Sequence, residues 1–275
     1  LLLETAGFSR ACGRGINLAS KGRRWAMATD GLAAAIQIAG MGRTSKVNYV
    51  IDLEMYGMES SLNRRTLKDS TEYLIRSMLL RGEMKVGEIY SANALAKELN
   101  ISNSPVREAM MSLVDRGLLE NVRNRGFRVV ELSDADNQEI YDLRLLIEVE
   151  AVRRVAAMEL DEAQSERLRS LAKKTDELHG AVTGEDMFRY LEADQQFHLY
   201  LVSLTGNGRW VQIVERLRDQ SRANGYYLDL MTSGKVRQTA TEHLEIVEAV
   251  LAQDDDAAEG LMVRHLDYAC PKGKK

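Results

Sequence analysis

The chain has 275 residues, with 37 lysines and arginines against 41 aspartates and glutamates, which gives a formal net charge of −4. This mild acidity argues against a protein that binds nucleic acid through a generally basic surface. Its 2 cysteines are too few for a disulfide framework or a thiolate metal cluster, so a cytoplasmic protein is the default expectation. The length suffices for one small domain and one of ordinary size.

Residues 1–57 do not share the patterns of the rest of the chain. They contain no sustained amphipathic stripe and no apolar run long enough to cross a membrane. Their arginine-rich, acid-poor beginning faintly resembles a transit peptide, whereas the apolar stretch 31–40 lies too far along for a simple signal peptide. We expect a disordered or non-native N-terminal extension, with Met55 or Met58 as the working start.

The next segment, residues 58–132, has the pattern of a winged helix-turn-helix. Its first helix has an apolar stripe at Leu67, Tyr73, Leu74, Met78 and Leu79. Pro105 fits the first turn of a third helix, where no intrahelical N–H bond is lost, and Gly117 ends that helix. The predicted elements are helices over 66–81, 92–100 and 102–117, and strands over 118–122 and 127–132.

The third helix and the hairpin are the candidate DNA-binding elements. Polar and positive side chains at a helix N-terminus can enter the major groove, where an arginine pairs with a guanine edge. Arginines on the hairpin can hold the DNA backbone or the minor groove. The alternative is that the unit is a protein–protein module. The predicted DNA-binding residues are Ser102, Asn103, Ser104, Arg107, Arg123, Arg125 and Gly126.

Charge is distributed unevenly along the chain. Residues 58–132, which we call the head, carry 12 Lys plus Arg against 10 Asp plus Glu, whereas residues 133–275 carry 18 against 27. A weakly basic head on an acidic body implies that two heads act together on paired half-sites. We therefore expect a homodimer on double-stranded, pseudo-palindromic operator DNA.

Residues 133–270 are predicted to form an all-helical bundle, followed by a tail at 271–275. The whole chain holds only 2 prolines, and long amphipathic runs alternate here with short breaks. Asp161 and Thr241 are plausible N-caps of the second and fifth helices. The fold class is therefore mainly α, with a metal ion and an effector expected inside the bundle. The predicted helices are 134–158, 161–178, 185–204, 207–230, 236–253 and 254–269.

Three of the 4 histidines and one aspartate suggest a metal site in this bundle. Asp194 and His198 share one helix face, whereas His243 and His265 would arrive from two other helices. One carboxylate and three imidazoles suit a divalent ion, zinc first, with nickel or manganese as alternatives. The other reading is that these residues are half-buried polar groups that meet no ion.

Arg144 is the first candidate for binding an effector. It interrupts an otherwise apolar helix face, and an inward guanidinium offers a bidentate clamp for a carboxylate. Its alternative role is a structural salt bridge to Glu148, four residues further on. Arg218 and Arg222 are weaker effector-binding candidates. An open metal position beside an arginine describes a pocket for a small organic acid.

Two sets of motifs resemble one known family. The stretch ALAKELNIS followed by NSPVREAMMSLVDRGLLENVRNRGF resembles the DNA-binding domain of GntR-family bacterial transcription regulators. The blocks IYDLRLLIEVEAV, EADQQFHLYL, LTGNGRW, EHLEIVEAV and MVRHLDY resemble the FCD ligand-binding domain of its FadR subfamily, and the short linker favours the six-helix VanR type. The resemblance spans about residues 63–270. It implies that Asp194, His198, His243 and His265 are metal ligands.

One position departs from the family pattern. The arginine that commonly stands two positions before the proline is Asn103 here, and an amide suits adenine better than guanine. We therefore do not expect this chain to share its relatives' operator sequence.

The expected function is sequence-specific transcription regulation. The chain would act as a non-enzymatic repressor whose operator affinity changes when a small carboxylate binds at the metal site. A metal-dependent hydrolase or oxygenase is one alternative, but it leaves the head unexplained. A binding module with a purely structural metal is another.

Overall fold

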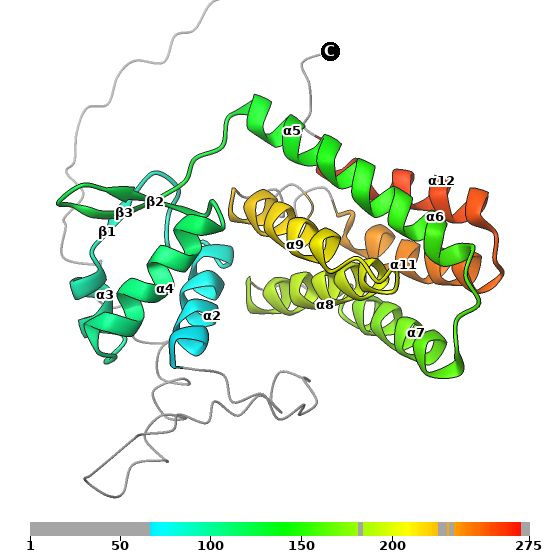
Figure 1. Cartoon of the computed structure of the whole chain (residues 1–275), viewed down its shortest axis with the longest axis horizontal. Helices are drawn as coiled ribbons and strands as arrows, with labels where there is room; N and C mark the ends of the chain where they lie inside the picture. Colours follow the sequence, from blue (N-terminus) through cyan, green and yellow to red (C-terminus); the bar gives the residue numbers. More distant parts are fainter. Residues whose placement is uncertain (1–66, 181–183, 225–229, 231–233, 271–275) are drawn as a thin grey trace, which may run out of the picture. The chain divides into compact units, whose positions relative to one another are not determined.

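The computed structural model describes residues 67–180, 184–224, 230 and 234–270 (Figure 1). The predicted N-terminal extension, residues 1–57, and the tail, residues 271–275, lie outside these described residues. Among the helices that are described, none is both long and apolar enough to cross a membrane.

The head is a winged helix-turn-helix, as the sequence predicts. Its elements are α2 (Leu67–Leu80), β1 (Ile89–Tyr90), α3 (Ala92–Glu98), α4 (Asn103–Asp115), β2 (Leu119–Val122) and β3 (Gly126–Val129). The three strands form an antiparallel sheet in the order β1-β3-β2 (Figure 1). Strand β1 was not predicted, because two residues are too short to show an alternating pattern. Its pairing requires Gly126, since a Cβ there would lie 2.4 Å from the carbonyl oxygen of Tyr90.

The core of the head lies between α2, α4 and the sheet. Ile75, Val106 and Leu113 are completely buried in it, and Phe127 of β3 closes it from the sheet side. The predicted stripe of the first helix was partly wrong, because Leu67 is 39% exposed and the fully buried Ile75 was left out. The stripe was drawn too near the helix start, where the chain has not yet reached the core.

The second half of the described chain is a helical bundle, again as predicted. Its first helical run consists of α5 (Asp134–Arg144), a π-helical turn (Leu145–Val149) and α6 (Glu150–Ala156). The others are α7 (Glu162–Glu177), α8 (Gly184–Ser203), α9 (Gly208–Ala223), α11 (Val236–Leu251), α12 (Asp255–Leu266) and a 3₁₀ turn (Asp267–Ala269). Helix α11 packs against α7 and α12, α12 against α6, and α8 against α7 and α9 (Figure 1). Because α8, α11 and α12 belong to one packed core, side chains from all three can meet inside it.

Helix ends show where local chemistry could be deduced from the sequence. The predicted cap Asp161 accepts a hydrogen bond from the backbone N–H of Gln164, and the Gln164 side chain completes a capping box. The predicted cap Thr241 is wrong: α11 already begins at Val236, and the Thr241 hydroxyl donates to the Arg237 carbonyl inside the helix, at 3.1 Å. The helix predicted over 207–230 is also too long, since α9 ends at Ala223.

Candidate metal and effector site

The four predicted metal ligands lie together in the interior of the bundle. Asp194 and His198 come from α8, His243 from α11 and His265 from α12. One potential ligand atom from each lies within 4.8 Å of the others, and all four residues are buried. His198 Nε2 is 3.1 Å from His265 Nε2 and 3.3 Å from His243 Nε2. Asp194 Oδ1 lies 3.4 Å from His243 Nε2, so the four ligand atoms converge on one point.

The other ring nitrogen of His243 is held by a hydroxyl. Thr175 Oγ1 lies 2.8 Å from His243 Nδ1 and donates its own hydrogen to the Ala172 carbonyl, at 2.7 Å. A hydroxyl whose hydrogen is already used can only accept from the ring, so the His243 proton belongs on Nδ1. This leaves the Nε2 lone pair directed at the cluster.

Carboxylates hold the outer nitrogens of the two remaining rings. His265 Nδ1 lies 3.1 Å from Glu242 Oε2. His198 Nδ1 lies 2.6 Å from Glu148 Oε2, a contact whose angles depart from those of a good hydrogen bond. Carboxylates on the outer side of histidines are a common feature of metal sites, because they fix the ring orientation and make the inner nitrogen more basic.

Burial keeps the imidazoles of His198 and His243 neutral at ordinary pH. It lowers the pKa of His243 to about 4. Burial, and then the charge of Arg218, also hold the pKa of His198 well below its usual value. Burial alone would raise the pKa of Asp194, but the charges of Arg218 and Arg222 outweigh it and hold that pKa well below its ordinary value. Asp194 is therefore a carboxylate, and His198 and His243 are neutral imidazoles, the protonation states that a metal ion requires of its ligands.

This arrangement fits a divalent cation better than it fits an empty core. Glu148 beside His198 Nδ1 and Glu242 beside His265 Nδ1 favour a proton on the outer nitrogen of these rings as well. With the protons there, the short distances between Nε2 atoms join lone pair to lone pair and are not hydrogen bonds. Buried acceptors without donors are unfavourable, whereas an ion among them would satisfy all of them at once.

Arg144 forms the salt bridge that the sequence offered as the alternative to a ligand role. Its Nε donates to Glu148 Oε1 at 2.8 Å, and both side chains are buried. The π-helical turn places Glu148 between this arginine and His198. Arg144 Nη2 is nevertheless a buried donor with no hydrogen-bond partner among the described residues. The salt bridge and an additional ligand role are therefore compatible.

Arg218 and Arg222 lie closer to the metal ligands than Arg144 does. They are one turn apart on α9, and both donate to Asp194 Oδ2. Arg218 Nη1 also donates to Glu148 Oε2, at 3.0 Å, while its buried Nε has no partner among the described residues. Because the arginines occupy Oδ2 of Asp194, its Oδ1 remains directed at the histidines.

Guanidiniums are concentrated on one side of the cluster. Arg144, Arg218 and Arg222 bring three positive charges there, whereas Asp194 and Glu148 are the carboxylates that contact them. Burial would raise the pKa of Glu148, but the two arginines beside it and His198 hold it well below the usual range, so the carboxylate is charged. Glu242, which contacts His265, is a third buried carboxylate, so the described site as a whole is balanced in charge. An anion would be attracted to the side where the arginines lie.

Sequence reasoning missed the residues that surround the ligands. Glu148 was considered only as a partner of Arg144, and Glu242, next to His243 in the chain, was not considered at all. The spacing of four residues from Arg144 was a usable signal for Glu148. For Thr175 no signal existed, because its contact with His243 joins α7 to α11.

The predicted DNA-binding residues lie on the surface of the head. Asn103, Ser104 and Arg107 are exposed in the first turns of α4, and Arg123 and Arg125 are exposed at the hairpin. Ser102 occupies the N-cap position of α4, although its side chain makes no capping hydrogen bond. Arg107, Arg125 and Gly126 line one hollow between the helix and the hairpin.

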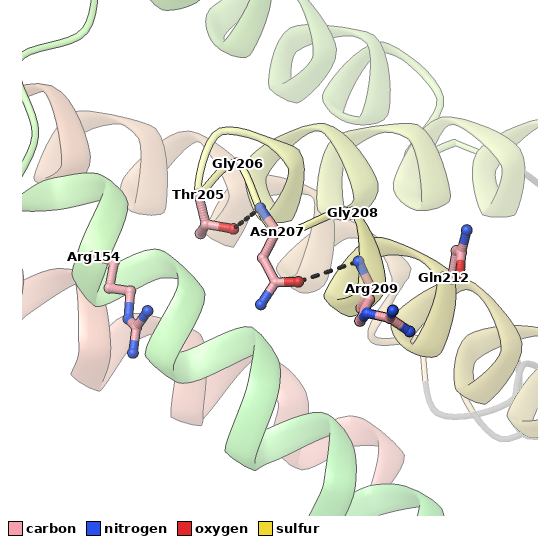
Figure 2. Close-up of a pocket in the computed structure, with 7 residues that line it drawn as sticks. All are labelled: Arg154, Thr205, Gly206, Asn207, Gly208, Arg209 and Gln212. Atoms are coloured by element: carbon pink, nitrogen blue, oxygen red, sulfur yellow. Dashed lines mark hydrogen bonds between the residues drawn. The ribbon is translucent and has the colours of Figure 1, made fainter.

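A second hollow lies at the start of α9 and does not belong to the metal site (Figure 2). The Asn207 side chain accepts hydrogen bonds there from the backbone N–H groups of Arg209 and Trp210. Arg154 binds Glu150 and lies over the Trp210 ring. The donors of this helix end and the nearby arginine are therefore already engaged.

Family models and known relatives match both halves of the chain. The model described as bacterial regulatory proteins of the gntR family matches residues 67–129, and the FCD domain model matches residues 139–268. The HTH-type transcriptional regulator YdhC of Bacillus subtilis is 31% identical over 200 residues, which cover 71% of this chain and 86% of the relative. The Exu regulon transcriptional regulator of Escherichia coli is 28% identical, over 70% of this chain and 79% of its own length.

Solved structures agree on the fold. Escherichia coli McbR/YncC superimposes with a TM-score of 0.64 at 20% identity, over 74% of this chain and 94% of that one. A GntR transcriptional regulator from Rhodococcus sp. RHA1 gives a TM-score of 0.58 at 23% identity, over 76% and 98% of the two chains. The family consists of transcription regulators, which removes the hydrolase or oxygenase alternative. This chain belongs to the GntR family of bacterial transcription regulators and combines a DNA-binding winged helix-turn-helix with an FCD domain.

Proposed function

We propose that this transcription regulator holds one divalent metal ion in its FCD domain and responds to a small organic acid bound beside that ion. The observation that carries the metal proposal is the convergence of three imidazole Nε2 atoms and Asp194 Oδ1 without a donor among them. Three nitrogens and one oxygen suit zinc best, with nickel or manganese as alternatives.

The effector proposal rests on the arginines. Arg144 Nη2 and Arg218 Nε are buried donors without hydrogen-bond partners among the described residues, and the three guanidiniums gathered there favour an anion. A carboxylate is planar and accepts two parallel hydrogen bonds, so it matches a guanidinium better than a spherical anion does. When bound, the metal would supply a Lewis-acidic position for one carboxylate oxygen, and Arg144, Arg218 and Arg222 would orient the rest of the acid.

The DNA proposal assigns direct base contacts to the start of α4. Arg107 would read a base edge in the major groove, with Ser102, Asn103 and Ser104 at the same helix end. Arg123 and Arg125 would hold the backbone from the hairpin, where Gly126 allows the turn. Regulation by repression is supported by the Escherichia coli relative GlaR, which is named a transcriptional repressor and is 26% identical over 70% of this chain and 89% of its own length.

The two domains would have separate roles. The head, residues 58–132, would bind DNA, and residues 133–270 would bind metal and effector and form the homodimer. The weak charge of the head supports a dimer that engages two half-sites of a pseudo-palindromic operator.

Metal analysis with a matched pair of variants tests the proposal. We expect about one metal ion per chain by plasma mass spectrometry in the wild type and in His179→Ala, and none in His243→Ala. His179 is the control because it is the remaining histidine of the chain and lies outside the cluster, with Nδ1 directed at the Asp176 carbonyl. Wild-type protein that binds no zinc, nickel or manganese after dialysis against each would rule the metal out.

A further inference from the structure

Helix α9 presents two sets of side chains to two different parts of the chain. Arg218 and Arg222 bind the metal-ligand residue Asp194. Asp219 and Gln220, their neighbours in sequence, instead contact residues of the head. One rigid helix therefore touches the candidate effector site and the DNA-binding domain within a single turn.

Asp219 is the centre of the contact with the head. It is completely buried and accepts two hydrogen bonds from Arg76 of α2, from Nε at 2.8 Å and from Nη2 at 2.7 Å. Burial by itself would lower the pKa of Arg76, but the charges of Asp219 and Glu192 outweigh it and raise that pKa, so the pair is ionic. A buried bidentate pair of this kind fixes geometry, because moving either partner leaves a charge unpaired.

The same aspartate also reaches the end of the proposed recognition helix. Arg116, the C-cap residue of α4, places Nη1 3.5 Å from Asp219 Oδ2 and binds Glu72 of α2 at 3.0 Å. The Arg116 carbonyl accepts a hydrogen bond from Gln220 Nε2, at 2.9 Å. Any change at Asp219 is therefore felt by both α2 and α4.

A single buried amide joins this contact to the metal and effector site. Gln195 follows the metal ligand Asp194 in α8 and is 4% exposed. Its Oε1 accepts from Arg222 Nη1 at 2.6 Å, and its Nε2 donates to Asp219 Oδ1 at 3.3 Å. Because Oε1 and Nε2 belong to one planar group, they cannot move independently.

We propose that Gln195 and Asp219 are positioning residues that transmit the state of the metal and effector site to the head. The inference rests on the proposed function of that site and names the route of its regulation. Arg222 divides its hydrogen bonds between Asp194 and Gln195. When Asp194 binds an ion, or an acid enters beside Arg222, that division changes and rotates the Gln195 amide. The amide then alters its bond with Asp219, and the Arg76 and Arg116 contacts follow.

Hydrogen–deuterium exchange of the full chain, before and after zinc is added to chelator-treated protein, tests this route. In the wild type, zinc changes the exchange rate of α2 and of the last turn of α4 by at least about fivefold, the lower end of common couplings between sites. In Gln195→Leu the same segments do not respond, although α11, which carries His243, still gains protection. Asp219→Asn provides a second variant with the same expectation, should the first fail to fold.

Gln220→Met is the matched control, because Gln220 touches the head from the same helix but lies outside the Arg222–Gln195–Asp219 chain. It transmits the zinc response like the wild type. A zinc response in α2 that survives both Gln195→Leu and Asp219→Asn overturns the inference, as does a wild type in which only α11 responds. If zinc protects no part of the bundle, including α11, the proposed metal site itself is refuted, and that result is distinct from the other two.

Discussion

Zinc should stabilise the wild-type protein and His179→Ala but not His243→Ala. His243 Nε2 lies 3.3 Å from His198 Nε2 and 3.4 Å from Asp194 Oδ1, so removing the ring deletes one of four ligands from the centre of the cluster. A ligand present at 100 times its dissociation constant adds about 2.7 kcal/mol to the free energy of unfolding. For a chain of this size about 1 kcal/mol raises Tm by roughly 2–4 °C, which gives an expected rise of roughly 5–11 °C.

The assay is calorimetric unfolding of chelator-treated protein, with and without zinc. His243→Ala also loses the packing of the His243 ring against the Phe197 ring, whose centroids lie 4.4 Å apart, and this loss by itself lowers Tm. The change in Tm on adding zinc is therefore compared within each variant. His179→Ala should show the wild-type rise. An equal rise in His243→Ala would show that zinc stabilises the protein somewhere else, and the four-residue site would have to be abandoned.

Three further outcomes follow from the proposed sites. Arg107→Ala should abolish specific operator binding, whereas Arg125→Ala should lower DNA affinity evenly across sequences. Footprinting on operator and random DNA distinguishes these two effects. Wild-type operator affinity in Arg107→Ala would refute the placement of α4 in the major groove. Arg144→Met should keep the metal and lose the response to the acid. Arg154 is exposed, so Arg154→Met should keep both, as measured by parallel metal analysis and acid titrations. A response to the acid that is retained in Arg144→Met would remove Arg144 from the effector site. The metal-free protein should lose stability as pH falls from about 6.5 to about 4, because the pKa of His243 is lowered in the folded state and the unfolded chain therefore binds the proton first. Urea titrations should show that this group changes the free energy of unfolding by up to about 1.4 kcal/mol per pH unit. A free energy of unfolding that does not change over this pH range would contradict a His243 ring that is buried in its neutral form.

The parts of the fold that the sequence predicts well are those set by local chemistry. The Asp161 cap and the break at Gly117 could be identified because capping and a positive φ, here +74°, are properties of a few adjacent residues. Thr241 fails by the same logic: it has the right side chain for a cap, but the helix had already begun at Val236. Residue type alone does not locate a helix start inside a long amphipathic run.

The candidate site shows a similar division. Asp194 and His198 could be paired by helical spacing. His243 and His265 were added because three imidazoles and a carboxylate suit a divalent metal, and the resemblance to the FCD domain then implied the same four ligands. Thr175 and Gln195 could not be found, because they act through partners on other helices. The π-helical turn that places Glu148 also has no reliable sequence pattern.

Operator affinity, measured with metal-loaded and metal-free protein across a panel of small carboxylic acids, shows whether the metal and an acid act together on DNA binding. The operator is first selected from random DNA with the purified protein. At least one acid should change the operator affinity of the metal-loaded protein by roughly 5- to 150-fold, the range of ordinary coupling free energies, and the same acid should leave the affinity of the metal-free protein unchanged. Metal-free protein that responds fully to that acid would show that the effector acts without the metal.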